Sequence, residues 1–340
     1  MNTLMKTVTV AAVASVALGG AAWAADLNLK FQGSDPAGSP NFELQKSWAD
    51  SIEQKTGGKV AIELLPVTSI VAHNETQDAI AAGILDGHVT DTSYFAGKDP
   101  AFGLIANPVG AWSAPQEMFD FINTGGGSNL MNELLNPYGL QFIGAMTPGL
   151  EAFVSKVPVN GVDDLKGLKM RAPEGMVQNV FSAAGAAPVN LPASEVFTSL
   201  DKGVIEAADY SVFSTNASQG MHDVAPYPIY PGFHSMPLVE VSINKNTWDS
   251  LDDETQNVLI GSVKEYALIQ VNSLAERDQK AVEEAKAGGK VTVIDWTPEE
   301  RAKFRTIAAT QWISVAERSS NAQHVYDVLT GYLKDNGLIK

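Results

Sequence analysis

Arg171 is the residue whose type and position best fit binding chemistry. It lies in the run LKGLKMRAP, after a short apolar strand with Leu168 and Met170, and a helix is expected beyond Pro173. Small ligands tend to bind open α/β sheets where a strand ends and a helix starts. A guanidinium there offers a rigid fork of donors that fits a carboxylate through two parallel hydrogen bonds. We interpret Arg171 as a carboxylate clamp; the alternative is an arginine paired with an acidic neighbour.

The segments before this run predict a first α/β unit. Apolar residues alternate in its strands, and its first helix has a capping serine, Ser39, with Pro40 in the first turn. Because strands and helices alternate along the chain, a parallel sheet with right-handed crossovers is expected. The predicted strands are 27–31, 60–64 and 88–94, and the predicted helices are 40–56 and 74–83.

A second set of strands and helices repeats this architecture. Two such units, joined by a few crossing strands, leave a cleft between them, and Arg171 lies at one of the strand ends that border it. The predicted strands are 139–146, 151–156, 168–172, 188–191 and 204–210, and the predicted helices are 175–184 and 194–202.

The last third of the chain is expected to connect the two units. The proline-punctuated segment 226–245 ends in an alternating pattern that fits a strand returning from one lobe to the other. Residues 252–287 predict one long helix, and 291–294 predict a short strand. Thr297 then opens a capping box with proline at the first helical position, which starts a helix to about residue 319, and another helix closes the chain.

Searches for catalytic motifs favour a binding protein over an enzyme. The sequence has no GxSxG elbow, no HExxH, no P-loop lysine motif and no GxGxxG after a strand. Its histidines form no pair at metal-ligand spacing, and His234 is the one expected near a ligand because its loop returns to the cleft. The others are interpreted as surface or hydrogen-bonded histidines: His73, His88, His222 and His324.

Composition and the N-terminal segment indicate export. Residues 1–24 carry one charge, Lys6, followed by an apolar run and the end Ala-Trp-Ala, which is typical of a secretory signal peptide. The formal net charge is −16, or −17 without Lys6, and such an acidic chain is a poor partner for nucleic acid or anionic lipid. There is no cysteine, which a chain of 340 residues tolerates because its core is large.

Three runs together resemble the solute-binding proteins of TRAP (tripartite ATP-independent periplasmic) transporters, of the dicarboxylate-binding type. They are DDLKGLKMRAP, SEVFTSLDKGVIEAAD and VEVSINKNTWDSLDDETQ. The runs YFAGKDPAFGL and YPGF resemble the branch that binds 2-oxo and 2-hydroxy monocarboxylic acids, sometimes with a metal ion. The resemblance implies a two-lobed α/β periplasmic-binding-protein fold, type II-like, with crossing strands and a long helix spanning both lobes.

From this resemblance we expect the following organisation. Residues 1–24 form the signal peptide, 25–147 with about 236–288 form lobe I and the connecting helix, and 148–235 with about 289–340 form lobe II. The protein is expected in the periplasm, as a monomer or a homodimer. It would deliver a small organic acid anion to the membrane permease, and it would not be an enzyme. A binding component for a sensor or chemoreceptor, or an enzyme on the same fold, are the alternatives.

The resemblance also assigns site residues. Arg171 matches the family's arginine that pairs with the ligand carboxylate, and Tyr94 matches an aromatic residue that lines the pocket from the first lobe. Asp209 and Tyr210 match a pocket acid or amide and its neighbour, which help to hold the cation in the metal-using branch. The alternative for Asp209 is a helix cap. Closure would bury the ligand beneath Tyr94, Tyr210 and Phe213.

Two positions depart from the patterns of relatives. Sialic-acid-binding relatives have a second arginine where this chain has Glu151, and the metal-using branch has a glutamate where it has Ser235. If Glu151 and Asp209 both face the cleft with Arg171, a ligand carboxylate brings the sum to −2, which is too costly to leave uncompensated. A Na or Ca ion, an ammonium group on the ligand or a protonated carboxyl would compensate. Otherwise one acid points elsewhere, and we favour this for Glu151.

Overall fold

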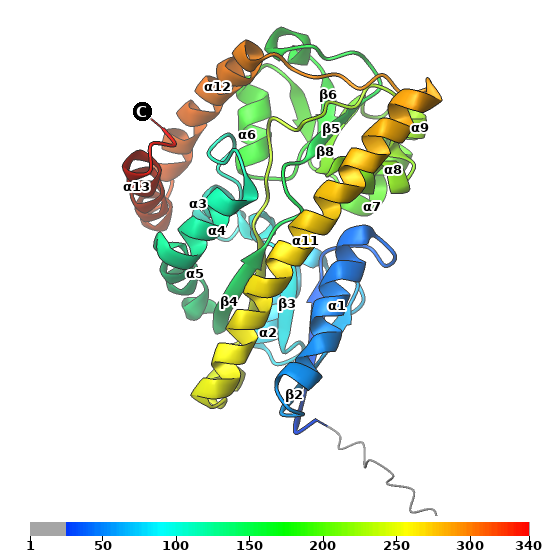
Figure 1. Cartoon of the computed structure of the whole chain (residues 1–340). Coiled ribbons are helices and arrows are strands. Elements are labelled where there is room, and N and C mark those ends of the chain that lie inside the picture. Colours follow the sequence, from blue (N-terminus) through cyan, green and yellow to red (C-terminus); the bar gives the residue numbers. More distant parts are fainter. Residues whose placement is uncertain (1–24, 340) are drawn as a thin grey trace, which may run out of the picture.

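The computed structural model describes residues 25–339, and these form two lobes that are each built on their own β-sheet (Figure 1). The predicted signal peptide, residues 1–24, lies outside the described residues. None of the helices in residues 25–339 combines the length and the apolar character that a membrane crossing requires.

The sheet of lobe I is mixed. Its strand order is β2-β1-β3-β9-β4; β1 runs parallel to β2 and β3, whereas β9 runs antiparallel to both β3 and β4. The parallel unit predicted from the first segments is therefore confirmed, and two strands from later in the chain extend it. The strands are β1 (Leu27–Gly33), β2 (Val60–Leu65), β3 (Gly87–Asp91), β4 (Leu140–Met146) and β9 (Val239–Asn244).

The first helix of lobe I begins where the sequence has a capping residue. The Ser39 side chain accepts a hydrogen bond from the Phe42 amide and caps the first helix, as predicted. The strand predicted at 88–94 ends early, because residues 92–95 form a 3₁₀ turn that carries Tyr94. The helices are α1 (Pro40–Lys55), α2 (Thr76–Ala81), α3 (Pro100–Ala106), α4 (Pro115–Thr124), α5 (Gly127–Leu135) and α10 (Lys245–Asp249), and the 3₁₀ turns are η1 (His73–Glu75), η2 (Thr92–Phe95) and η3 (Asn136–Tyr138).

The sheet of lobe II has the strand order β5-β8-β6-β7. In it β6 runs parallel to β7 and β8, and β5 runs antiparallel to β8. Arg171 is the last residue of β6, and the next helix begins at Met176, so the predicted strand end beside a helix start is confirmed. The elements are β5 (Ala152–Ser155), η4 (Val162–Leu165), β6 (Lys169–Arg171), α6 (Met176–Ala183), β7 (Ala187–Val189), α7 (Ala193–Asp201), β8 (Ala207–Ser211), α8 (Phe213–Ser218) and α9 (Met221–Val224).

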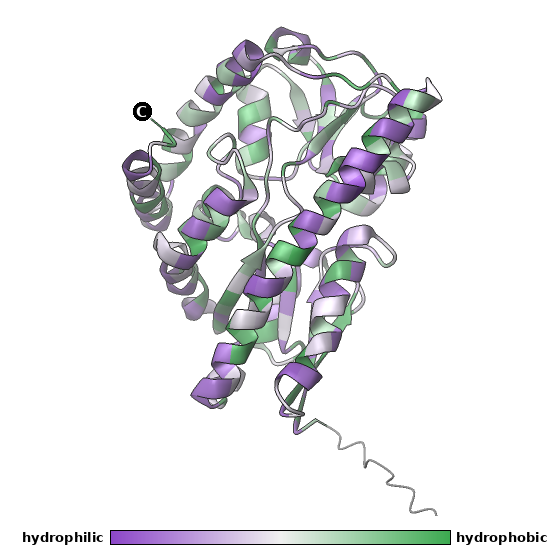
Figure 2. Cartoon of the chain, in the orientation of Figure 1, coloured by the Kyte–Doolittle hydropathy of each residue, from purple (hydrophilic) through white to green (hydrophobic). Residues whose placement is uncertain are grey.

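One long helix, α11 (Asp253–Gly288), crosses both lobes (Figure 1). It packs against α1 and β4 in lobe I and against α8 in lobe II. Asp278 near its C-terminal end accepts a hydrogen bond from the Ser214 amide at 2.7 Å, and Ser262 accepts one from the Trp48 indole at 2.9 Å. Hydrophilic residues predominate on the face of α11 that is turned to the viewer in Figure 2. The helix thus connects the two lobes through its apolar and polar contacts on the opposite face.

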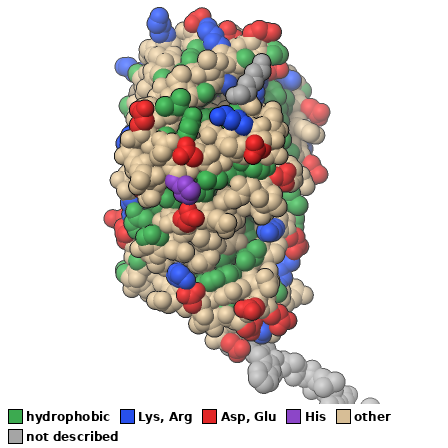
Figure 3. Space-filling model, turned by 90° about the vertical axis from the view of Figure 1, so that its left-hand side faces the viewer, with side chains coloured by type: hydrophobic (Ala, Val, Ile, Leu, Met, Phe, Trp, Pro, Cys, Tyr) green, Lys and Arg blue, Asp and Glu red, His purple; other side chains and the backbone are tan. Residues whose placement is uncertain are grey.

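Two more helices follow along the side of the molecule. Helix α12 (Pro298–Ala316) packs against α6 of lobe II, but α13 (Ser320–Asp335) packs against α3 of lobe I, so the C-terminal segment contacts both lobes rather than lobe II alone. On the face with these helices, acidic, basic and hydrophobic side chains are scattered among one another (Figure 3). The strand predicted at 291–294 is reduced to a single bridge between Ile294 and Ile229.

Candidate functional site

The backbone of lobe II fixes the Arg171 guanidinium in place. Nε donates to the Leu191 carbonyl at 3.1 Å and Nη1 donates to the Asp209 carbonyl at 2.7 Å, while the side chain is only 5% exposed. The nearest carboxylate oxygen, Oδ2 of Asp209, is 4.0 Å from Nη1, which is a loose ion pair and too long for a hydrogen bond. Within residues 25–339, Nη2 has no hydrogen-bond partner. Nη2 is therefore free to donate a hydrogen bond to a ligand.

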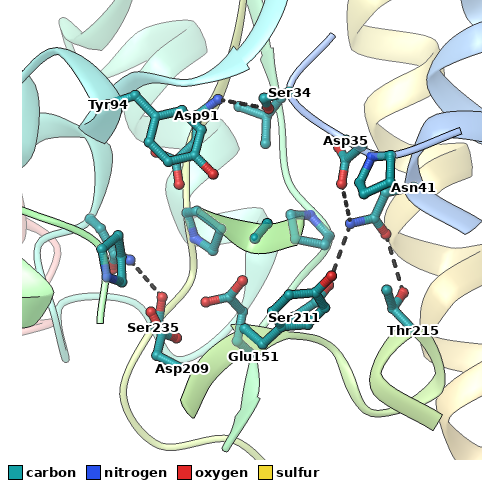
Figure 4. A pocket seen from close by; sticks show the side chains of 18 of the residues that line it. Ser34, Asp35, Asn41, Asp91, Tyr94, Glu151, Asp209, Ser211, Thr215 and Ser235 are labelled. Atoms are coloured by element: carbon teal, nitrogen blue, oxygen red, sulfur yellow. Dashed lines mark hydrogen bonds between the residues drawn. The ribbon is translucent and has the colours of Figure 1, made fainter. Parts of the chain in front are cut away.

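A pocket lies between the lobes beside this guanidinium (Figure 4). It encloses about 690 Å³, including its opening to solvent. Strand ends and loops of lobe I supply one wall, and the other is supplied by lobe II, through β6 and β8, the segments after them, and Glu151 just before β5. Six of the residues proposed from the sequence line it together: Tyr94, Glu151, Arg171, Asp209, Tyr210 and Ser235.

His234 lies behind Asp209 and does not line this pocket. Its Nε2 is 2.7 Å from Oδ1 of Asp209, and its ring packs against Phe153, Phe181 and Phe233. Among the described residues Nδ1 has no partner, so we place the proton on Nε2, where it is donated to the carboxylate. His234 therefore orients Asp209 instead of reaching the ligand directly.

Phe213 is also placed outside the pocket lining. It is the first residue of α8, fully buried, and packs on the rings of His222 and Tyr230. The same helix removes the alternative interpretation of Asp209, because its N-cap residue is Val212 and no side chain caps it. Asp209 is thus a pocket acid held by His234, and Phe213 is a core residue in a cluster with Ala152 and Val282.

Glu151 faces the pocket, so the expectation that it points elsewhere is corrected (Figure 4). The residue is 6% exposed and lies beside Asp209 and Ser235. Burial, followed by the charge of Asp209, raises the pKa of Glu151 well above its ordinary value. The pKa of Asp209 is lowered: burial opposes this, but the hydrogen bond from His234 outweighs it. Of the two acids, Glu151 is therefore the one whose surroundings favour the protonated form.

Two acids of lobe I complete the lining, and neither belongs to the set predicted from the sequence. Asp91 ends β3 and accepts the Ser93 amide at 2.8 Å; burial raises the pKa of Asp91 to about 6. Asp35 follows β1 and accepts side-chain amides from Asn41 and Gln45 at 3.3 and 3.0 Å, and burial raises its pKa as well. Their position at the carboxyl ends of adjacent parallel strands is the signal that identifies them.

Asn41 joins the two lobes at one side of the pocket (Figure 4). Its amide nitrogen is 3.4 Å from the Ser211 hydroxyl, and its amide oxygen accepts from the Thr215 hydroxyl at 3.4 Å. Asn41 belongs to α1 in lobe I, whereas Ser211 and Thr215 belong to lobe II. These long hydrogen bonds are weak, and they bring the lobes into contact without closing the pocket completely.

Glu151, Asp209 and His234 form the one group among residues 25–339 with the composition and spacing of a cation site. One ligand atom from each lies within 4.8 Å of the others. The His234 nitrogen nearest the group is already bonded to Asp209, so the two carboxylates are the ligands available. Carboxylate oxygens suit hard cations such as Ca²⁺.

Comparison with known proteins identifies the family. A model of the bacterial extracellular solute-binding proteins, family 7, matches residues 31–319, which is most of the chain. The chain belongs to this family. The two sheets, the helix α11 across both lobes and the pocket between them are the structural form that this family takes here.

Three proteins are similar to this chain along most of its length. A TRAP periplasmic solute-binding protein from Rhodobacter sphaeroides, in an apo open structure, is 64% identical, with coverage of 92% of this chain and 99% of that one and a TM-score of 0.77. A monocarboxylate 2-oxoacid-binding periplasmic protein of Nostoc is 25% identical, with coverage of 88% of this chain and 86% of its own. A TRAP solute-binding protein from Bordetella bronchiseptica, with calcium and picolinate in one site, is 21% identical, with coverage of 92% and 93% and a TM-score of 0.83. These likenesses confirm the predicted two-lobed fold.

Proposed function

We propose that this solute-binding protein acts in the periplasm, captures a small organic acid between its lobes and delivers it to the membrane permease of a TRAP transporter. The observation that carries the proposal is the Arg171 guanidinium, buried and fixed by two carbonyls, with Nη2 free beside an interlobe pocket. The relative named for 2-oxoacid binding and the TRAP relative at 64% identity support it. A binding component for a sensor or chemoreceptor is the alternative, and co-purification with a permease distinguishes the two.

In the proposed mechanism, the ligand enters the open pocket and Arg171 takes its carboxylate. Closure of the lobes buries the ligand beneath Tyr94 and Tyr210, and the permease recognises the closed form. Micromolar affinity corresponds to about −8 kcal/mol, whereas a charge-assisted hydrogen bond contributes roughly 1.5–3 kcal/mol. The remaining binding energy has to come from buried apolar area and from hydrogen bonds of both lobes. No covalent step is involved, and we propose a carrier rather than an enzyme.

We propose Glu151 and Asp209 as the residues that hold a Na or Ca ion when one accompanies the ligand. Their oxygens lie close enough together to share an ion, which would replace the proton on Glu151. The calcium and picolinate in the Bordetella relative support this arrangement.

A thermal-shift screen of small organic acids, with and without chelator, tests the proposal. A ligand that binds the folded form raises the melting temperature, and calorimetry then gives the affinity. Arg171→Ala should fold and lose binding by roughly a hundredfold or more, because the ligand charge is left unpaired. Arg277→Ala, at an exposed position on α11, is the matched control and should bind normally. Unchanged affinity in Arg171→Ala would remove Arg171 from the site and reject the proposal.

A further inference from the structure

The charges that line the pocket do not match a simple anion. Among the described residues, four carboxylates and one guanidinium line it, and the lining contains no lysine. With every group ionised, four negative charges against one positive leave three negative. A ligand carboxylate alone would add a fourth to a partly buried site, where uncompensated charge is costly. The acids are Asp35, Asp91, Glu151 and Asp209.

The two acids of lobe II lie next to partners on their own wall of the pocket. Asp209 accepts a hydrogen bond from Nε2 of His234 and lies 4.0 Å from the Arg171 guanidinium. Glu151 lies beside Asp209 and Ser235 on the same wall. Within residues 25–339, the only guanidinium in the lining therefore belongs to the wall that carries these two acids.

The two acids of lobe I lie next to neutral donors instead. Asp35 accepts two side-chain amides and Asp91 accepts one backbone amide, and these donors orient the carboxylates without adding positive charge. Among the described residues, no lysine, arginine or histidine forms an ion pair with either. The nearest imidazole on this side is His73, whose ring packs on Tyr94; burial and then Arg171 lower the pKa of His73, so it is uncharged at neutral pH.

A second feature is a nitrogen on a buried guanidinium, unpartnered within residues 25–339 and close to aromatic rings in the lining. Arg171 is more than nine-tenths buried, yet its Nη2 is without a partner among the described residues beside the pocket. The rings of Tyr94 and Tyr210 also line the pocket, and aromatic faces attract cations. In Figure 4, Asp91 and Tyr94 approach from one side, and Glu151 and Asp209 approach from the opposite side.

We infer that the ligand is a zwitterion whose carboxylate binds Arg171 while its ammonium or quaternary nitrogen lies against Asp35 and Asp91. The inference rests on the proposed function and narrows it from organic acids in general to amino-acid-like or betaine-like molecules. Such a ligand adds no net charge to the pocket. It also supplies the positive partner that both lobe I carboxylates lack, across the same interface that closure brings together.

Matched pairs of ligands test the inference directly. The amino members glycine, β-alanine, γ-aminobutyrate and δ-aminovalerate are compared by calorimetry with acetate, propionate, butyrate and valerate, all in chelator. At least one amino member should bind about tenfold more tightly than its partner, which equals about 1.4 kcal/mol. The chain length of the amino acid that binds most tightly measures the distance between the site for the carboxylate and the site for the nitrogen. Glycine betaine, tested in the same way, reports whether a quaternary nitrogen is accepted.

Variants of the two lobe I acids test where the ligand nitrogen binds. Asp35→Asn and Asp91→Asn, which keep the shape and one acceptor oxygen of each side chain, should each reduce the preference for the amino member at least fivefold, while Asp26→Asn at an exposed position should not. The inference is overturned if no amino member binds better than its partner, or if both variants keep the preference. Binding of the deaminated acid that appears only on adding Ca²⁺ also overturns it, since a metal then supplies the charge.

The outcome for Arg171→Ala separates this inference from the proposed function. If that variant binds the preferred amino member as well as the wild type does, the carboxylate site itself is rejected. If Arg171→Ala abolishes binding of every acid while amino and deaminated members bind the wild type equally, the proposed function stands and the zwitterion inference alone fails. Thermal melts of each variant establish that it is folded before binding is compared.

Discussion

His234 holds Asp209 from behind: Nε2 of the imidazole is 2.7 Å from Oδ1 of the carboxylate, and both side chains are buried. The loop that carries His234 is itself anchored, because Phe233 stacks on Trp296 with ring centroids 3.8 Å apart. The imidazole is surrounded by phenylalanine rings and does not line the pocket. A pocket acid is therefore oriented by a distant loop rather than by its own strand.

His234→Phe should weaken ligand binding about tenfold or more while it keeps the aromatic packing. It removes the donor that keeps Asp209 ionised and oriented, and an unsatisfied buried group costs about 1–3 kcal/mol. Calorimetry with the best organic acid and urea unfolding measure the two effects. His234→Gln, whose amide can still donate, should recover part of the binding; equal loss in both variants would contradict an orienting role.

Asp91→Asn should stabilise the folded protein at neutral pH but not in acid. Burial raises the pKa of Asp91 from 3.8 to about 6. Below 3.8 the carboxyl is protonated in both states and costs nothing. As the pH rises towards 6 the unfolded state loses this proton first, so the wild type loses stability, and the full cost is present above pH 6. That cost is at most about 3 kcal/mol.

Urea unfolding of the wild type and Asp91→Asn at several pH values across this interval measures the difference. The difference in unfolding free energy between Asp91→Asn and the wild type should increase as the pH rises and then stay constant. Asp26→Asn, at an exposed position, controls for the loss of one negative charge. A gap of the same size at every pH would show that the effect is not the titration of Asp91.

The order of elements and the position of Arg171 at a strand end beside the pocket could be predicted from sequence because both depend on local pattern. Alternation and capping located β1, α1 and α11 to within a few residues, and the strand that ends at Arg171 is where it was expected. The resemblance to TRAP solute-binding proteins added Tyr94, Asp209 and Tyr210, all of which line the pocket. Local pattern does not reveal which strands pair, and β4, grouped with the second unit by its position, pairs in the sheet of lobe I.

The rest of the site depends on contacts between distant segments. Whether Glu151 faces the pocket is decided by the loop of Gly232 and Ser235, which lies against it. Phe213 is an aromatic residue just after a pocket strand, but the start of α8 turns it into the core. Asp35 differs from these two, because its position after β1 at the carboxyl end of a parallel strand is a signal that the sequence carries. The placements of Glu151 and Phe213 have no signature in sequence spacing.

His88→Ala should reduce the unfolding free energy by about 3–5 kcal/mol, because it breaks a buried pair and leaves a charge behind. His88 Nε2 is 2.6 Å from Oε1 of Glu240, and Oε2 of the same carboxyl accepts from the Thr92 hydroxyl; both members of the pair are fully buried. The pair joins β3 to the returning strand β9. Urea unfolding measures the loss, and Glu240→Gln should lose less, since its amide keeps hydrogen-bond partners.

An exposed histidine pair provides the matched comparison for this prediction. His324 and Glu133 are 3.0 Å apart, but their side chains are 54% and 60% exposed. His324→Ala should change the unfolding free energy by less than about 0.5 kcal/mol, because exposed pairs contribute little. Comparable losses in His88→Ala and His324→Ala would mean that burial of the β3–β9 pair does not matter to stability.

Gly232→Ala should damage the site through the backbone that carries Glu151. A Cβ atom at position 232 would lie 2.0 Å from the Glu151 carbonyl oxygen, so one of the two loops must shift. We expect lower stability and at least tenfold weaker ligand binding, measured by thermal melting and calorimetry, because the loop also carries Ser235 and His234. Gly261→Ala in α11 has open space around its Cβ and should stabilise the protein by about 0.5–1 kcal/mol. Normal binding by a folded Gly232→Ala protein would show that the pocket does not depend on this close approach.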